Sequence, residues 1–373
     1  MSVRRPARLS AAAAGLATAL LAAGCGKPEP LRIGYLGELS GRYAELGEAA
    51  RDGLALAADD LRGRGLLGER PVEVLVRGTG DGPGDAARAA RELAAAGVEA
   101  IVGPGTAAMA EAVRPVTEQA GIVLLSPTAA TGRACGRDDR VFCLRQADGE
   151  GGADAARRTT GRGLRRLTIA IAGDSRHLTQ DWLTAFRAAF ERAGGQVPAS
   201  LFFASGGDPA ELAALVRELL RPGPDGLLIV APAAETARLA RGVREVNPGL
   251  PLIATEWAAS EALVAQGGRA VEGMRLVDGI DRQDASPRFR EFRERHARQF
   301  KREPVAASVL GFDAGTAVLE AMARRPAGMP LKEALIRLGP FAGLQQPVRF
   351  DAHGDAHRKA YHVVIRDGRF VTE

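Results

Sequence analysis

The chain has 373 residues, of which 46% are hydrophobic and 25% charged, and its formal net charge is +5 at pH 7. Only four of its fifty basic residues are lysines, and the arginines are spread along the whole chain. This distribution lacks the local basic patch of a nucleic-acid-binding protein, so we expect no nucleic-acid partner. The length and the apolar content are sufficient for two hydrophobic cores.

The first 24 residues are typical of a secretory signal peptide. Three arginines, Arg4, Arg5 and Arg8, precede an uncharged stretch at 9–23, which is the order of regions in a signal sequence. This stretch is shorter than the roughly 20 residues that cross a membrane, and we expect no other stretch to approach that length. Removal of residues 1–24 would lower the net charge from +5 to +2.

Cys25 directly follows this apolar stretch and a run of three small residues. The run resembles the lipobox of bacterial lipoproteins, whose cysteine is acylated and becomes the new N-terminus, although Leu21 lies one position earlier than usual. We therefore expect Cys25 to anchor the protein to a membrane in the periplasm or cell envelope, with residues 25–30 as a tether. Ordinary signal cleavage that leaves Cys25 as an incidental thiol is the alternative.

The region after the tether alternates short apolar runs with alanine-rich segments at helical spacing. The apolar runs of the first half lie at 31–36, 72–76, 100–103 and 122–126. After 141–146 the pattern restarts, with runs at 167–173, 197–203, 226–231, 251–255 and 271–277, and helices predicted at 181–195, 209–220 and 233–246. Such alternation predicts an α/β fold of two doubly wound parallel-sheet lobes with helices on both sheet faces.

The residues from 284 onward follow a different pattern. Helices are predicted at 286–304, 306–323 and 331–338, and a strand pair around the Asp367-Gly368 turn. Because these elements must pack on lobes already built, we expect a hinge with multiple crossovers. The predicted division is 31–146 plus 280–350 for the N-terminal lobe and 147–279 plus 351–373 for the C-terminal lobe.

Two further cysteines, Cys135 and Cys143, lie eight positions apart. In an exported protein such a pair favours a disulfide, and two free thiols are the alternative. No histidine or additional cysteine accompanies them at the spacing of zinc ligands, so we expect no metal.

The ligand site of a two-lobed α/β protein is expected at the carboxyl ends of its parallel strands. In the first lobe these ends lead into loops rich in Gly, Ser and Thr, at 37–45, 77–85, 103–108 and 126–131. A helix that begins at Ala107 or Ala108 would direct its N-terminal dipole into the cleft and favour a carboxylate or another anion. The alternative is that these small polar residues only cap helices.

The sequence does not carry the motifs of the common enzyme classes. The segment at 78–84 fails as a dinucleotide fingerprint, because Pro83 or Asp85 stands where the third glycine belongs. GxSxG, HExxH and Walker sequences are absent. We therefore expect no catalytic activity and no cofactor.

Four segments, at 33–61, 102–131, 186–195 and 346–355, carry a resemblance to a known family. In order and spacing they resemble the leucine/isoleucine/valine-binding protein family of type I periplasmic solute-binding proteins, over nearly all of 31–373. The resemblance implies a two-lobed clamp that closes on an amino acid or similar small solute and delivers it to an ABC transporter permease complex. A non-transport lipoprotein of the same fold, acting as a ligand sensor or as the activator of a cell-envelope partner, is the alternative.

The resemblance also implies which residues contact the solute. Family members bind the α-carboxylate and α-ammonium groups with two loops of the first lobe and an acidic residue of the second. The matching ligand-binding positions in this sequence are Gly105, Thr106, Ala107, Thr128, Ala129, Ala130, Thr131, Asp174, Leu178, Glu256 and Trp257. Alanine replaces the usual threonine of the second loop, and Leu178 and Pro232 replace two tyrosines. Glu256 would meet the ammonium group, and Trp257 would either offer a flat apolar surface or pack within its lobe.

Overall fold

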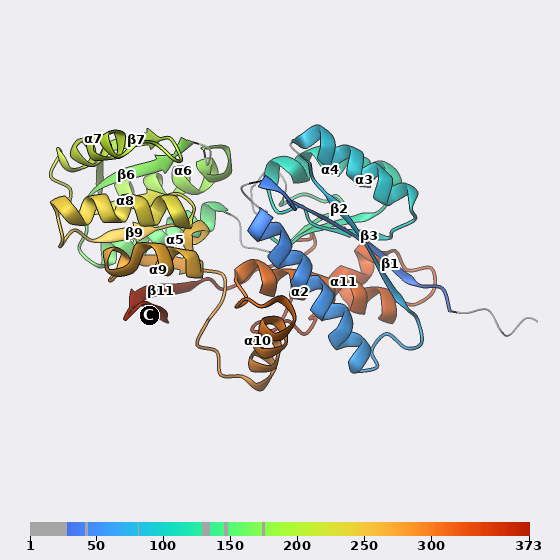
Figure 1. The fold of residues 1–373 in the computed structure, drawn as a ribbon. Helices are drawn as coiled ribbons and strands as arrows, with labels where there is room; N and C mark the ends of the chain where they lie inside the picture. The colour runs from blue at the N-terminus through green and yellow to red at the C-terminus, as the bar shows by residue number, and fades with distance from the viewer. Residues whose placement is uncertain (1–27, 42–43, 81, 129–134, 145–147, 174–175) are drawn as a thin grey trace, which may run out of the picture.

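The computed structural model describes residues 28–41, 44–80, 82–128, 135–144, 148–173 and 176–373. Its strands form two separate sheets, each within one lobe (Figure 1). The first sheet has the order β2-β1-β3-β4-β5 and all of its strand pairs are parallel. Its strands are β1 (Leu31–Gly37), β2 (Val72–Gly78), β3 (Ala100–Val102), β4 (Val123–Ser126) and β5 (Val141–Cys143).

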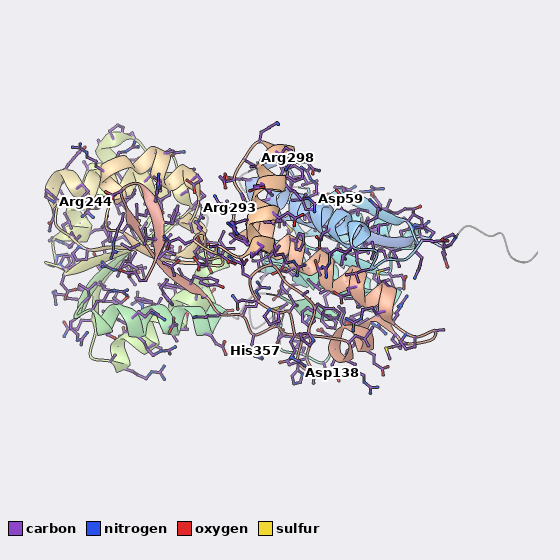
Figure 2. All side chains as sticks on the ribbon, turned by 90° about the horizontal axis from the view of Figure 1, so that it is seen from below. Asp59, Asp138, Arg244, Arg293, Arg298 and His357 are labelled. Atoms are coloured by element: carbon purple, nitrogen blue, oxygen red, sulfur yellow. A yellow bond between two sulfur atoms is a disulfide. The ribbon has the colours of Figure 1, made fainter. Side chains whose placement is uncertain are left out.

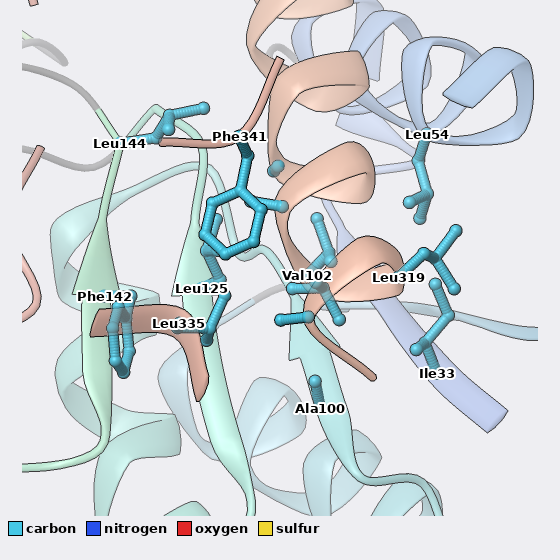
Figure 3. Close-up of a cluster of buried hydrophobic side chains, with 14 of the residues drawn as sticks. Ile33, Leu54, Ala100, Val102, Leu125, Phe142, Leu144, Leu319, Leu335 and Phe341 are labelled. Carbon is cyan, nitrogen blue, oxygen red and sulfur yellow. The ribbon is translucent and has the colours of Figure 1, made fainter. Parts of the chain in front are cut away.

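Helices cover both faces of the first sheet. Its helices are α2 (Ala44–Gly63), α3 (Pro83–Ala95), α4 (Ala107–Ala120), α10 (Pro287–Phe300), α11 (Ala306–Arg324) and α12 (Leu331–Arg337). Alternate residues of each strand point to opposite faces, so Val102 packs with α2 and α11 whereas Ile101 packs with α3 and α4. Figure 3 shows α11 lying directly on the sheet, with Leu319 near Ile33.

Helix α11 packs against α2 with unusually close backbones. A Cβ atom on Gly53 would lie 1.9 Å from the Ser308 carbonyl oxygen, and one on Gly311 would lie 2.1 Å from that of Ala50. The contact therefore requires glycine at both positions. Helix α11 is also long and apolar enough to cross a membrane, contrary to our expectation that no second stretch would be, but 83% of its most apolar window is buried inside the protein. Its apolar composition serves the core.

The second sheet has the order β12-β11-β10-β9-β8-β6-β7. Its strands are β6 (Arg166–Ala172), β7 (Gln196–Phe203), β8 (Gly226–Val230), β9 (Leu252–Ala254), β10 (Arg275–Asp278), β11 (Tyr361–Arg366) and β12 (Arg369–Thr372). Strands β6 to β10 are parallel, and the β11-β12 hairpin adds to β10 in antiparallel fashion. Asp367 and Gly368 both have positive φ, at 50° and 67°, as a tight hairpin turn requires.

Helices also cover both faces of the second sheet. Helices α5 (Asp148–Gly161) and α6 (Arg176–Arg192) lie on one face, and α7 (Pro209–Leu220), α8 (Ala233–Val246) and α9 (Glu261–Gly267) on the other. The predicted architecture, two mainly parallel sheets with helices on both faces, is confirmed.

Two buried ion pairs hold the segments that run between the lobes. Asp278, at the end of β10, is fully buried and lies 2.7 Å from the Arg282 guanidinium. Asp313 of α11 is equally buried and lies 2.7 Å from that of Arg358. Ala356 packs in the core of the first lobe. We therefore propose that the final crossing falls between Ala356 and Tyr361, a few residues after the position expected from the sequence.

Charged side chains extend from the surfaces of both lobes (Figure 2). Many of them form exposed ion pairs, such as Arg62 with Asp59 at 3.2 Å and Arg293 with Glu303 at 3.1 Å. Exposed pairs of this kind contribute little stability each, about 0–1 kcal/mol. The many arginines are therefore not evidence for an anionic partner.

Candidate functional site

Three loops meet at the carboxyl edge of the first sheet. Glu38 directly follows β1, Gly105 follows β3, and Ser126 and Thr128 lie at the end of β4. The Gly105 N–H donates to Glu38 Oε2 at 3.2 Å, and the Thr128 hydroxyl donates to the Gly105 carbonyl at 2.8 Å. The Ser126 hydroxyl donates to the Pro104 carbonyl at 2.6 Å. These side chains fix the backbone of the loop that leads into α4.

Gly105 lies at the centre of this cluster, closely surrounded by side-chain atoms. A Cβ atom there would lie 2.9 Å from Glu38 Oε2 and 3.1 Å from Thr128 Oγ1. Such distances are too short for a normal contact, so a side chain would push the Glu38 carboxylate or the Thr128 hydroxyl aside. The glycine therefore permits the close approach that the three loops need.

Helix α4 begins at Ala107, as predicted, and its N-terminus points into the cluster. Thr106 is its N-cap residue, with extended backbone (φ −113°, ψ 148°), and makes no capping hydrogen bond through its side chain. The free N–H groups at a helix N-terminus attract an anion. In this protein the Glu38 side chain lies beside that N-terminus, where its Oε2 accepts a hydrogen bond from the Gly105 N–H.

The Glu38 side chain is almost completely buried, with 5% of its surface exposed. Burial raises the pKa of Glu38 above its ordinary value, while N–H groups of the neighbouring backbone, including Gly105 and Thr106, and the Thr106 hydroxyl act in the opposite direction. No donor within the described part of the chain has hydrogen-bond geometry toward Oε1. Our sequence analysis missed Glu38, although its signal was visible: an acidic residue among small ones, directly after a buried strand.

The corresponding edge of the second sheet is aromatic. Trp257 lies in a short 3-10 helix, Glu256–Ala258, directly after β9. Its ring meets that of Trp182 edge-on at 6.2 Å, and Trp182 stacks on Phe186 at 5.3 Å. Trp257 is half-buried. These contacts favour the packing interpretation of Trp257, and the part of its surface that stays exposed remains available to a solute.

The predicted contact residues fall into three groups. Gly105 and Thr128 lie together, and Thr106 and Ala107 begin the adjoining helix. Glu256 and Trp257 lie in the short 3-10 helix after β9 of the second sheet, and Leu178 belongs to α6. Ala129, Ala130, Thr131, Asp174 and Cys25 lie outside the described residues.

Cys135 and Cys143 are joined by a disulfide, with their Cα atoms 5.9 Å apart. Cys143 is the last residue of β5, so the bond ties the preceding loop to the sheet. Asp355 lies close to both sulfur atoms. Because the two sulfurs are bonded to each other, this group offers no thiolate to a metal ion.

Comparison with known proteins identifies the family. A sequence model described as "Periplasmic binding protein" matches residues 30–369, which is most of the chain. The chain belongs to the periplasmic binding protein family. This confirms the predicted resemblance, and the family consists of extracytoplasmic solute-binding proteins, not enzymes.

Individual relatives of this periplasmic binding protein are distant in sequence and close in fold. The Leu/Ile/Val-binding protein BraC3 of Rhizobium johnstonii is 26% identical over 176 residues, which are 44% of this chain and 45% of the relative. The match thus spans less than half the length of that curated relative.

Solved structures match the fold over nearly the whole chain. Leucine-binding protein LivK of Thermotoga maritima is 24% identical with a TM-score of 0.79, covering 92% of this chain and 97% of its own. LivJ of Streptococcus pneumoniae, in complex with isoleucine, is 20% identical with a TM-score of 0.80, and the match covers 92% of this chain and 100% of the LivJ chain. A solute-binding protein of R. palustris, in complex with benzoate, is 20% identical with a TM-score of 0.79, and the match covers 92% of this chain and 95% of that protein's chain.

Proposed function

We propose that this periplasmic binding protein closes on a small solute, an amino acid or a related compound, and delivers it to the permease of an ABC transporter. The observation that carries the proposal is the loop cluster at the carboxyl ends of β1, β3 and β4. There Gly105 and Thr128 are fixed by hydrogen bonds beside the N-terminus of α4. Ligands of open α/β sheets bind at this edge.

The names of the relatives support this solute class. BraC3 is named for leucine, isoleucine and valine, the LivJ structure contains isoleucine, and the R. palustris structure contains benzoate. An aliphatic amino acid and an aromatic acid are thus both bound by proteins of this fold. For the present chain we propose contacts from the two first-lobe loops and from Glu256 and Trp257 of the second lobe.

The mechanism we propose is hinge closure. One lobe binds the solute first, and the other adds contacts that exist only in the closed form, so that the solute shifts the population toward closure. A shift from mostly open to mostly closed requires about 5.5 kcal/mol of differential binding. A few charge-assisted hydrogen bonds, such as those of Glu256 with an ammonium group, would supply it.

A thermal-shift screen of the mature protein against amino acids, amides, short peptides and aromatic acids tests the function. A solute at a hundredfold excess over its Kd should stabilise the protein by about 2.7 kcal/mol. We expect Glu256→Ala to weaken the binding of an amine-bearing solute severely while the variant still folds. If no solute raises the melting temperature, the transport function is wrong and the alternative of an activator that acts by protein contact is favoured.

We further propose that Cys25 carries a lipid anchor. The support comes from the apolar stretch and the small residues that precede Cys25. Cell fractionation tests this proposal: the native protein should sediment with membranes, whereas Cys25→Ser should appear in the soluble envelope fraction. A native protein that is already soluble would show ordinary signal cleavage.

A further inference from the structure

We infer that Glu38 fills, with its own carboxylate, the anion position at the N-terminus of α4, so that the solute presents an amide or amine group there and not a free carboxylate. This inference rests on the proposed solute-binding function and names the class of solute. It assigns a specificity-determining role to a residue that the family resemblance did not indicate.

The position of Glu38 is built into the fold. Glu38 directly follows β1 and lies between α2 and the start of α4. A Cβ atom on Gly47 of α2 would lie 2.1 Å from the Glu38 carbonyl oxygen. On the other side, the Gly105 N–H binds Oε2 directly before α4. Because backbone atoms hold Glu38 from both sides, its carboxylate has little freedom to leave the helix N-terminus.

The groups that donate hydrogen bonds to the carboxylate are neutral. The donors that favour its charged form belong to backbone N–H groups, including those of Gly105 and Thr106, and to the Thr106 hydroxyl, and no arginine, lysine or histidine is among them within the described residues. Tyr35 is also close, since the charge of Glu38 adds to burial in raising the pKa of Tyr35. A second carboxylate entering this cluster would meet the negative charge of Glu38, and among the described residues no cationic side chain donates a hydrogen bond to Glu38 to offset it.

The Oε1 atom of Glu38 is an acceptor that lacks a hydrogen-bond donor among the described residues. Oε1 is buried, and a buried acceptor without a donor is costly. An N–H group of a solute amide or ammonium would supply the missing donor and match the charge. A free carboxylate of a solute has no hydrogen-bond donor to offer to Oε1, and its negative charge repels that of Glu38.

Matched solutes test the class. We would measure the affinities of 4-methylpentanoate and 4-methylpentanamide, and of benzoate and benzamide, by calorimetry at pH 7.5. The native protein should bind at least one amide about tenfold more tightly than its acid, since a hydrogen bond to a charged group is worth about a factor of ten. Glu38→Gln should remove or reverse that preference, and Glu69→Gln, a control at an exposed acid before β2, should keep it. Equal affinities for acid and amide, unchanged in Glu38→Gln, would overturn the inference.

A second experiment does not depend on the solute. Glu38→Ala vacates the helix N-terminus, so added formate should bind there and raise the melting temperature of this variant, but not that of the native protein or of Glu69→Ala. No response to formate would overturn the occupancy by Glu38 even if solutes bind. A formate response in a protein that no solute stabilises would instead contradict the transport function alone. If Glu38→Ala does not fold, the Glu38→Gln comparison still decides the question.

Discussion

The carboxyl edges of the two sheets have similar topology and different chemistry. In the first lobe, carboxylate, hydroxyl and backbone groups hold one another in place around Gly105. In the second lobe, Trp257 extends a row of rings formed by Trp182, Phe186 and Phe190. The comparison shows that one fold can hold the region around the ends of its strands either with directional hydrogen bonds or with packed aromatic rings.

The largest expected effect lies in the aromatic edge. Trp182 is 3% exposed and contacts two other rings. We expect Trp182→Ala to lower the free energy of unfolding by about 3–5 kcal/mol, because it leaves a large cavity. Urea denaturation measures this loss, and Val246→Ala, at a side chain that is 61% exposed, should change stability by less than about 0.5 kcal/mol. A small loss in Trp182→Ala would show that the rings do not support this edge.

A smaller effect is expected in the polar edge. The buried Ser126 hydroxyl donates to the Pro104 carbonyl, and Ser126→Ala leaves that carbonyl without this donor. We expect a loss of about 1–2 kcal/mol in the free energy of unfolding, measured by the same denaturation. A variant as stable as the native protein would show that hydrogen bonds do not hold the loop before α4.

The smallest effect is the pH dependence that Glu38 contributes. Because burial raises its pKa in the folded protein, the folded state holds this proton more tightly than the unfolded chain. Stability is therefore fully present below the unfolded pKa, about 4.3, and is lost as the pH rises through the folded value. Denaturation across pH 4–8 should show the native protein losing stability relative to Glu38→Gln as the pH rises. A constant difference would mean that Glu38 has an ordinary pKa.

Most of the secondary structure could be predicted from the sequence. The first strand of each lobe, 31–36 and 167–173 as predicted, is found at Leu31–Gly37 and Arg166–Ala172. Such runs are readable because burial on both faces makes a parallel strand continuously apolar. The start of α4 was equally readable, since small polar residues precede an alanine-rich helix. Whether an apolar helix such as α11 belongs to a core or to a membrane could not be predicted, because composition alone does not separate a core helix from a membrane span.

The sequence by itself determined the succession of strands and helices, since each follows from a local pattern of apolar residues and turns. Only the tertiary structure decided that Glu38 meets Gly105, 67 residues further along the chain. That meeting arises because β1 and β3 are parallel neighbours, so the loops after them emerge side by side at one edge. The charge of the site therefore depends on strand order, which no local pattern encodes.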